Sequence, residues 1–251
     1  LIIIVVLLIG IVGLWQIQRR AKPAEAGWFN ESWQYRRSIG ISNPSGSNLT
    51  DFQVSVNIGT SALIAAGKMK SDCSDIRFTD QNGKLLDYWI EENNPGCNQT
   101  TDTKIWVKLP SLPTSNATAY LYYGNPSATA YADGEKVFLE FDDFNDSSTL
   151  GNWTAESNPG TTYSISGGTM SCTANADYSS AVLGSAYTSA IVNSRFNISS
   201  GQTHGGFVFR GQTTAADNGY QWILRRSTSD NRIQRRTSSA QYYLIGGANG
   251  E

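Results

Sequence analysis

Residues 51–58 read DFQVSVNI and place Phe52, Val54, Val56 and Ile58 at alternate positions. Side chains two residues apart lie on one face of a strand, so the pattern predicts a half-buried β-strand. Five other stretches of the first half have the same character, and turn residues such as Asn-Pro and Asn-Gly separate them. Their spacing predicts one two-sheet sandwich in residues 33–133. These stretches are QYRRSIGIS (34–42), DIRFTD (75–80), LLDYWIEE (85–92), TKIWVKLP (103–110) and ATAYLYYG (117–124).

Residues 134–251 predict a second all-β domain. KVFLEFDDF (136–144) gives the strongest strand signal there, and TTYSISGGTM (161–170) and SAIVNSRFNIS (189–199) follow it. GGFVFRG (205–211), GYQWILRR (219–226) and NRIQRR (231–236) complete the pattern, which stops at GGANGE without a closing strand. We therefore expect a mainly β protein with two sandwich domains, of which the second is incomplete.

The first 15 residues are all apolar and predict a helix over residues 1–22, followed by a linker over 23–32 that begins at Pro23. Such a segment fits a signal peptide, a membrane anchor or the core helix of a filament. It is short for a bilayer span, which needs about 20 apolar residues. Its basic flank at Arg19, Arg20 and Lys22 would also favour keeping the following domains in the cytoplasm. We expect the segment to be retained and to pack against copies of itself, with the membrane anchor as the alternative. Its residues are Leu1, Ile2, Ile3, Ile4, Val5, Val6, Leu7, Leu8, Ile9, Gly10, Ile11, Val12, Gly13, Leu14 and Trp15.

The composition argues against several functions. Charged residues are 16% of the chain and the net charge is -2, whereas nucleic-acid binders usually carry a basic excess. The sequence contains no Walker-type glycine loop, no dinucleotide fingerprint and no Cys-x-x-Cys pair. We expect no cofactor, no metal and no nucleic-acid partner.

The cysteines and the glycosylation sequons indicate an extracellular location. Cys73 and Cys97 flank two predicted strands and are candidates for a disulfide, which forms in oxidising compartments. Cys172 is then a buried thiol or bonds to another chain. Nineteen Asn residues and a Ser/Thr frequency of about one in five predict roughly four sequons by chance, and the chain has seven. They are at Asn30, Asn48, Asn98, Asn116, Asn145, Asn152 and Asn197.

Candidates for catalysis and sugar binding have simpler structural interpretations. EFDDFND (140–146) supplies Glu140, Asp142, Asp143 and Asp146, but Asn145 stands at the last position of the Glu-x-Asp-x-x-Glu motif of laminarinase-type jelly rolls, so these acids favour structural roles. Glu91 and Glu92 are adjacent and so face opposite ways on a strand. His204 lacks a nearby nucleophile. Aromatic and arginine side chains on the strands could bind glycans, but their spacing favours packing and solvated sheet faces. These are Trp89, Trp106, Tyr122, Tyr123, Tyr220 and Trp222, with Arg210, Arg225, Arg226, Arg232, Arg235 and Arg236.

Three resemblances add to this interpretation. The stretches WQYRRSIGISNPSGSNLTDFQVSV, GKMKSDCSDIRFTDQNGKLLDYWIE, KIWVKLPSLP, YLYYGNP and VFLEFDDF resemble the domain of unknown function 2341 of prokaryotic surface proteins over residues 33–145. That resemblance implies a β-sandwich at the cell surface. FDDFND, WTAESNPGTTYSISGGTM and GFVFRGQTTAADNGYQWILRR are similar to the front part of a concanavalin-like (laminin-G-like) jelly roll.

The apolar first residues resemble the mature start of archaeal type IV pilin-like proteins, although position five lacks the glutamate that bacterial pilins usually carry. We expect a non-enzymatic subunit of an extracellular pilus-like filament. It would pass through the membrane before assembly, polymerise with itself through the N-terminal helix and display its β-domains, for example for adhesion. The alternatives are a membrane-tethered lectin or adhesin that binds surface glycans and, after it, a glycoside hydrolase.

Overall fold

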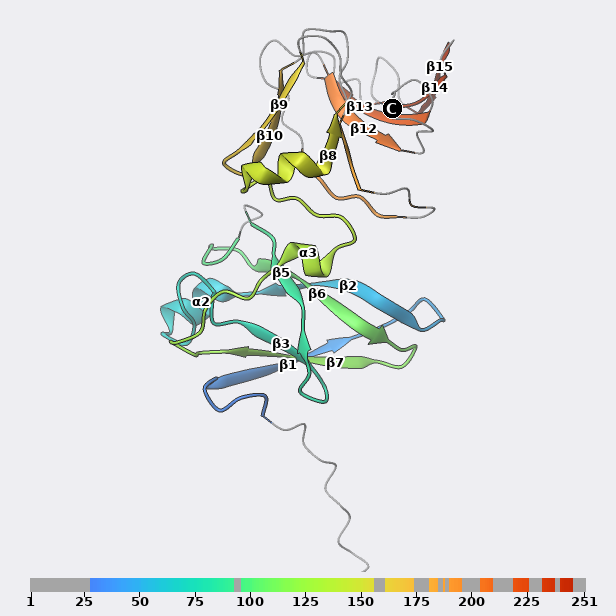
Figure 1. Cartoon of the computed structure of the whole chain (residues 1–251). Helices are drawn as coiled ribbons and strands as arrows, with labels where there is room; N and C mark the ends of the chain where they lie inside the picture. Colours follow the sequence, from blue (N-terminus) through green and yellow to red (C-terminus); the bar gives the residue numbers. More distant parts are fainter. Residues whose placement is uncertain are drawn as a thin grey trace, which may run out of the picture. The chain divides into compact units, whose positions relative to one another are not determined.

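The computed structural model describes residues 28–92, 96–155, 161–173, 181–184, 187 and 190–195, and the backbone of four further strands (Figure 1). The predicted helix over residues 1–22 lies outside the described residues. The described residues are mainly β, with antiparallel sheets and few helices, as the sequence predicted. The chain divides into two compact units, of which the first ends at Phe141 and the second begins at Asp142.

The first unit is β-sandwich-like and contains two antiparallel sheets (Figure 1). One sheet has the order β1-β7-β3-β4 and the other has the order β2-β6-β5. All six strand stretches predicted from the alternating pattern are strands. Their bounds are β1 Tyr35–Ile41, β2 Leu49–Ile58, β3 Arg77–Asp80, β4 Leu85–Leu86, β5 Tyr88–Ile90, β6 Thr103–Leu112 and β7 Ala117–Tyr123. A short helix, α2 (Thr60–Ala65), follows β2.

The core lies between the two sheets because each strand turns its alternate apolar side chains inward. Phe78 and Leu121 are paired across β3 and β7, and Ile105 of β6 comes from the other sheet. All three are fully buried. The pattern of residues 51–58 holds from Val54 to Ile58, whereas Phe52 is 41% exposed beside Asp51, whose φ of 49° is left-handed.

The second unit contains small antiparallel sheets. A 3-10 helix η1 (Ser147–Asn152) leads into β8 (Trp153–Ala155), which pairs with β11 (Ala181–Leu183). The strands β9 (Thr162–Ser166) and β10 (Thr169–Thr173) form a hairpin. The backbone of β12 (His204–Phe209), β13 (Gly219–Arg225), β14 (Arg232–Thr237) and β15 (Ala240–Ile245) forms a four-stranded sheet in sequential order.

Two expectations for the second half were wrong. Residues 136–144 are not a strand: α3 (Gly134–Val137) begins there, because Asp133 caps it, and residues 138–141 follow without regular structure. The described part of the predicted strand 189–199, residues 190–195, is not a strand either. The four-stranded sheet also contains β15, a strand that the sequence pattern did not predict.

Among the residues that the structure describes, no helix has the length and apolar character that a bilayer crossing requires.

Candidate functional site

Residues 28–33, named here the N-terminal cover, lie against Tyr122 of β7, an inner strand of the β1-β7-β3-β4 sheet. The rings of Trp28 and Phe29 meet the Tyr122 ring edge-on, at 5.4 Å and 5.7 Å between centroids. The backbone N–H of Phe29 donates to the Tyr122 hydroxyl at 3.2 Å, and Trp33 Nε1 donates to the carbonyl of Asp75 at 3.0 Å. Edge-to-face aromatic pairs stabilise beyond the area that they bury. The chain is therefore fixed to the sandwich before β1 begins.

Arg36 of β1 strengthens this attachment. Its guanidinium carbon lies 4.6 Å from the centroid of the Tyr120 ring and 5.2 Å from that of Trp28, distances typical of cation–π contacts. Trp28 nevertheless remains 43% exposed. Arg36 thus links the Trp28 ring of the cover to the Tyr120 ring of the sheet.

Arg77 of β3 contacts the chain segment before β1 and the chain segment after β7. Its guanidinium lies 5.3 Å from the ring centroid of Trp33, in the N-terminal cover, and 5.0 Å from the ring centroid of Tyr131, which follows β7, the last strand of the first unit. Nη2 donates to the carbonyl of Thr129 at 2.9 Å, and Nη1 donates to that of Ser74 at 3.2 Å. Arg77 is only 8% exposed. A buried guanidinium needs such acceptors for its N–H groups, so we name Arg77, Trp33 and Tyr131 the Arg77 clamp.

Residues 124–141, named here the C-terminal connector, leave the sheet in a fixed direction. Gly124 has a φ of 85°, and a Cβ there would crowd the Tyr35 ring and the carbonyl of Lys68. Its N–H donates at 2.9 Å to the carboxylate of Asp75, which is 1% exposed and also accepts from the backbone N–H of Lys70. The start of the connector is therefore hydrogen-bonded to Asp75, the same residue whose carbonyl accepts the hydrogen bond from the Trp33 indole.

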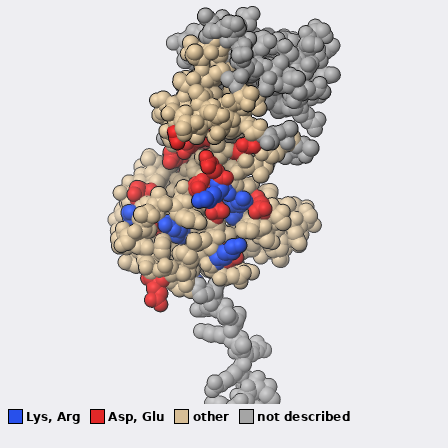
Figure 2. Space-filling view, in the orientation of Figure 1, with Lys and Arg blue, Asp and Glu red and all other residues tan. Residues whose placement is uncertain are grey.

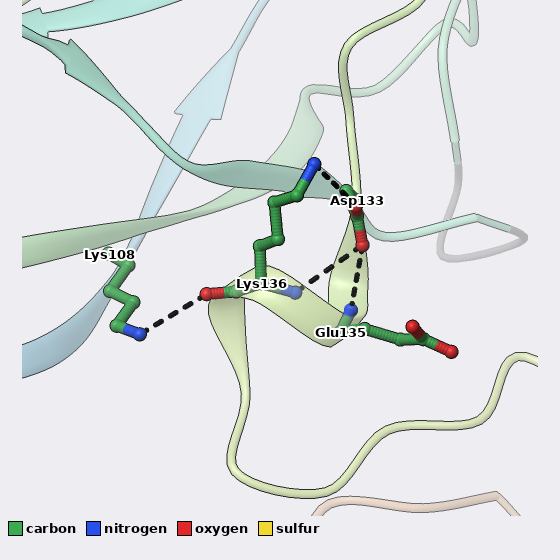
Figure 3. A network of polar contacts seen from close by, with 4 residues as sticks. All are labelled: Lys108, Asp133, Glu135 and Lys136. Atoms are coloured by element: carbon green, nitrogen blue, oxygen red, sulfur yellow. Dashed lines mark hydrogen bonds and ion pairs between the residues drawn. The ribbon is translucent and has the colours of Figure 1, made fainter.

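The connector then crosses to the other sheet and forms α3 (Figure 3). The backbone N–H of Asp133 donates to the carbonyl of Tyr88 at 2.9 Å. The Asp133 carboxylate accepts from the backbone N–H groups of Glu135 and Lys136 and forms an ion pair with Lys136 Nζ at 2.9 Å. The hydrogen bond from the Lys136 side chain is the largest cause that lowers the pKa of the Asp133 carboxyl, and the backbone N–H groups lower it further. The carboxylate in turn raises the pKa of the Lys136 ammonium group. Lys108 Nζ donates to the Lys136 carbonyl at 3.3 Å and ties α3 to β6.

Two of the predicted sugar-stacking residues, Trp89 and Trp106, are packed against the connector. The Phe141 ring lies 5.0 Å from that of Trp89, and the Phe138 ring lies 5.6 Å from that of Trp106. Tyr122 is fully buried and Tyr123 stacks on Tyr35. These four aromatic residues serve packing, as their spacing favoured. The side chains of Tyr220 and Trp222 lie outside the described residues.

The predicted acidic candidates form structural bonds. Glu91 is 8% exposed and accepts from Trp106 Nε1 at 2.8 Å and from Lys104 Nζ at 3.0 Å. Asp142 accepts from Trp153 Nε1 at 2.8 Å. Asp143 and Asp146 each accept from the backbone N–H two residues ahead, and that bond lowers the pKa of Asp146. Glu91 therefore bonds to side chains of β6, whereas Asp142, Asp143 and Asp146 stabilise turns and the start of η1.

The surface of the described residues shows no built metal site. No group of three or more His, Cys, Asp or Glu side chains in this part of the chain is placed to hold a metal ion. On the face drawn in Figure 2, basic and acidic side chains of the first unit lie close together and do not form a patch of one sign. His204 and the arginines of the last strands have side chains outside the described part.

The disulfide prediction is confirmed. Cys73 and Cys97 are bonded, and the bridge joins the loop before β3 to the loop before β6. Cys172 is free within the chain and exposed, so it is not the buried thiol of the first alternative, and a bond to another chain stays a prediction. Six of the seven sequon asparagines are exposed, and Asn197 lies outside the described residues. The six are Asn30, Asn48, Asn98, Asn116, Asn145 and Asn152.

The Arg77 clamp was not predicted from the sequence. Its signal was an arginine between Ile76 and Phe78, two fully buried residues of one short strand stretch. A charged residue between core residues indicates a buried cation, but nothing in the sequence specifies which rings it meets.

The two sheets, the disulfide and the tightly covered ends define the first unit as a β-sandwich-like module. A comparison with family models finds one match: residues 72–156, which begin in this unit and extend past its end at Phe141, match the family described as Domain of unknown function (DUF2341). The strands β1 and β2 precede the matched residues but pair with β7 and β6 inside them. No curated protein and no solved structure matches the chain.

Proposed function

We propose that the protein is a structural subunit of an extracellular pilus-like filament. Residues 1–15 form the helix that packs with copies of itself in the filament core, and both β-units are displayed outward. The second unit is the front part of a concanavalin-like jelly roll. The N-terminus is of the archaeal type IV pilin-like kind, and the subunit resides in the membrane before assembly.

The observation that carries this proposal is the apolar segment and its attachment. Residues 1–15 contain twelve Leu, Ile and Val residues. Each contributes roughly 1.5–3 kcal/mol when fully buried, so complete burial amounts to about 20 kcal/mol or more. That value exceeds the association cost of roughly 4–15 kcal/mol. The N-terminal cover, which begins at Trp28, supports a firm connection between such a helix and the sandwich.

The extracellular location is supported by independent features of the first unit. A disulfide between Cys73 and Cys97 is stable in oxidising compartments. The exposed sequon asparagines of the described residues are accessible to a glycosyltransferase, as surface sequons must be.

The test is polymerisation of the purified full chain after removal of detergent. Electron microscopy should show helical filaments, and centrifugation should sediment most of the protein. The Ile9→Asp variant should lose filaments because the carboxylate would be buried in the helix bundle. Leu139→Asp is the matched control: Leu139 is 73% exposed, so its variant should polymerise normally.

A different result would refute the filament. If the full chain stays as single copies in detergent and enters liposomes without forming filaments, the apolar segment is a membrane anchor. The protein is then a tethered surface adhesin, and a glycan array with the liposome-bound chain would test its ligand.

A further inference from the structure

The strand register places the start and the end of the sandwich at one point. β1 begins at Tyr35, which lies opposite Tyr123, the last residue of β7. The two strands are antiparallel neighbours, so the chain enters and leaves at the same end of this ladder. Tension applied to both ends would separate the strands one residue pair at a time, because each backbone hydrogen bond is loaded in turn. Sequential loading is the weak direction of a β-ladder.

The Arg77 clamp lies just outside that weak end. Trp33, two residues before β1, and Tyr131, in the connector after β7, both contact the guanidinium of Arg77. Arg77 itself is held in the sheet, because β3 pairs with β7 and Nη2 bonds to the Thr129 carbonyl. The segment before β1 and the segment after β7 are therefore both fixed to the Arg77 side chain. Tension applied to the two segments acts on these contacts before it reaches the first residue pair of β1 and β7.

We propose that the Arg77 clamp is a mechanical lock that carries tension between the N-terminal segment and the second unit, and so protects the β1–β7 ladder from sequential opening. The source of tension rests on the proposed function, in which the filament core holds one end and displayed units experience drag. The lock itself is a property of the sandwich and is measurable on single molecules.

The connector distributes the load to the second sheet as well. Beyond Tyr131, the Asp133 N–H bonds to the Tyr88 carbonyl, and Gln53 Nε2 donates to the Val137 carbonyl at 2.8 Å. Tension at Phe141 therefore acts first on contacts with β5 and β2, and reaches the clamp only after α3 has detached. The unit should open in two steps, α3 first and the clamp second.

The experiment is force spectroscopy of the full chain held by handles at its two termini. The first unit is recognised by its disulfide, which keeps the 24-residue separation between Cys73 and Cys97 closed. Adding a reductant should lengthen its unfolding event by about 8 nm, at roughly 3.5 Å per released residue. Events from the second unit, which contains no disulfide within this chain, should not change.

The decisive variant is Arg77→Met, which keeps an unbranched, flexible stem and removes the guanidinium with its charge and donors. We expect the unfolding rate at fixed force to rise by roughly tenfold or more, because two cation–π contacts and the charge-assisted hydrogen bonds are lost. Tyr131→Leu removes only the connector side of the clamp and should give a smaller rise. Arg37→Met, at an exposed arginine of β1, is the matched control and should match the wild type.

The direction of pulling separates a lock from ordinary stability. Handles at the exposed turn residues Asn82 and Ser115 load the sandwich without loading the cover or the connector. The Arg77→Met change should be much smaller in this geometry. An equal change in both geometries, or none between the termini, would overturn the proposal. Filament formation is scored separately, so a chain that does not polymerise but shows the directional effect refutes only the proposed function.

Discussion

The Cys97→Ser variant measures how much the disulfide stabilises the first unit. Cys97 is the better member to replace, because Cys73 is 1% exposed and its Sγ lies 3.9 Å from Met69 Sδ, so the core packing stays intact. The two cysteines are 24 residues apart. For a closed loop of that length the chain-entropy relation gives about 3.5 kcal/mol at 25 °C. The variant should lose this amount from its free energy of unfolding.

Urea unfolding gives the measurement. With a slope of roughly 1–3 kcal/mol per M for a domain of this size, the midpoint should fall by about 1–3 M. Hydrogen exchange of a peptide from β6 reports the first unit alone, since β6 pairs with both β2 and β5 in its sheet. Wild-type protein in reductant should behave like Cys97→Ser. The Cys172→Ser variant is the matched control, because Cys172 is free and exposed, and its free energy of unfolding should stay within about 0.5 kcal/mol of the wild type.

An unchanged β6 midpoint in Cys97→Ser would refute this reasoning. So would alkylation of three thiols in the native chain without reductant, because the structure leaves only Cys172 free. A fall much larger than about 5 kcal/mol would mean that the serine disturbs packing beyond the cross-link, since that is the upper range for one bridge.

The connector and the core give three more predictions. Asp133→Ala should cost roughly 1 kcal/mol at pH 7, as loss of an N-cap does. Folding lowers the pKa of the Asp133 carboxyl in the wild type, so the wild type should be more stable than the variant above about pH 4, the pKa in the unfolded chain. The difference should disappear as the pH falls through the folded pKa, which acid titrations of stability measure. Gly134→Ala should cost about 1–3 kcal/mol because its methyl overlaps the Phe141 ring, whereas Gly151→Ala, with open space around it, should not; thermal melts compare the two. Burial raises the pKa of Tyr88 to about 12, so its contribution to stability should be full below about pH 10 and decline as pH rises toward 12, and alkaline melts of Tyr88→Phe should lack that decline.

The strands of the sandwich were predictable because each obeys a local rule. Val54 and Val56 alternate with polar residues, and Ile105 and Val107 do the same in β6, so the buried face can be read from each segment alone. The disulfide was equally accessible, because only one pair of cysteines flanked the same predicted strands. These features depend on neighbours in the sequence or on a count of one residue type.

The strand predicted over residues 136–144 was wrong because two local signals conflict there. Phe138, Leu139 and Phe141 make an apolar run, which favours a strand, while Asp133 supplies a helix cap. The outcome depends on Trp89 and Trp106, whose rings receive Phe138 and Phe141. Those partners belong to strands some thirty or more residues earlier, so the decision is a tertiary one and no periodicity within the segment can report it.

Arg77 shows why the candidate site was beyond sequence reasoning. Trp33, Arg77 and Tyr131 belong to three distant stretches and meet only after β3 and β1 have paired with β7 in one register, with Arg77 and Arg36 both opposite Tyr122. A shift of that register by one residue would turn Arg77 toward the core and Phe78 toward the cover. The clamp therefore depends on the same pairing that buries Phe78, and a leucine at position 77 would keep the burial but lose the connection between the two ends of the chain. An arginine at this position is explained by that connection, because burial alone would favour an apolar residue.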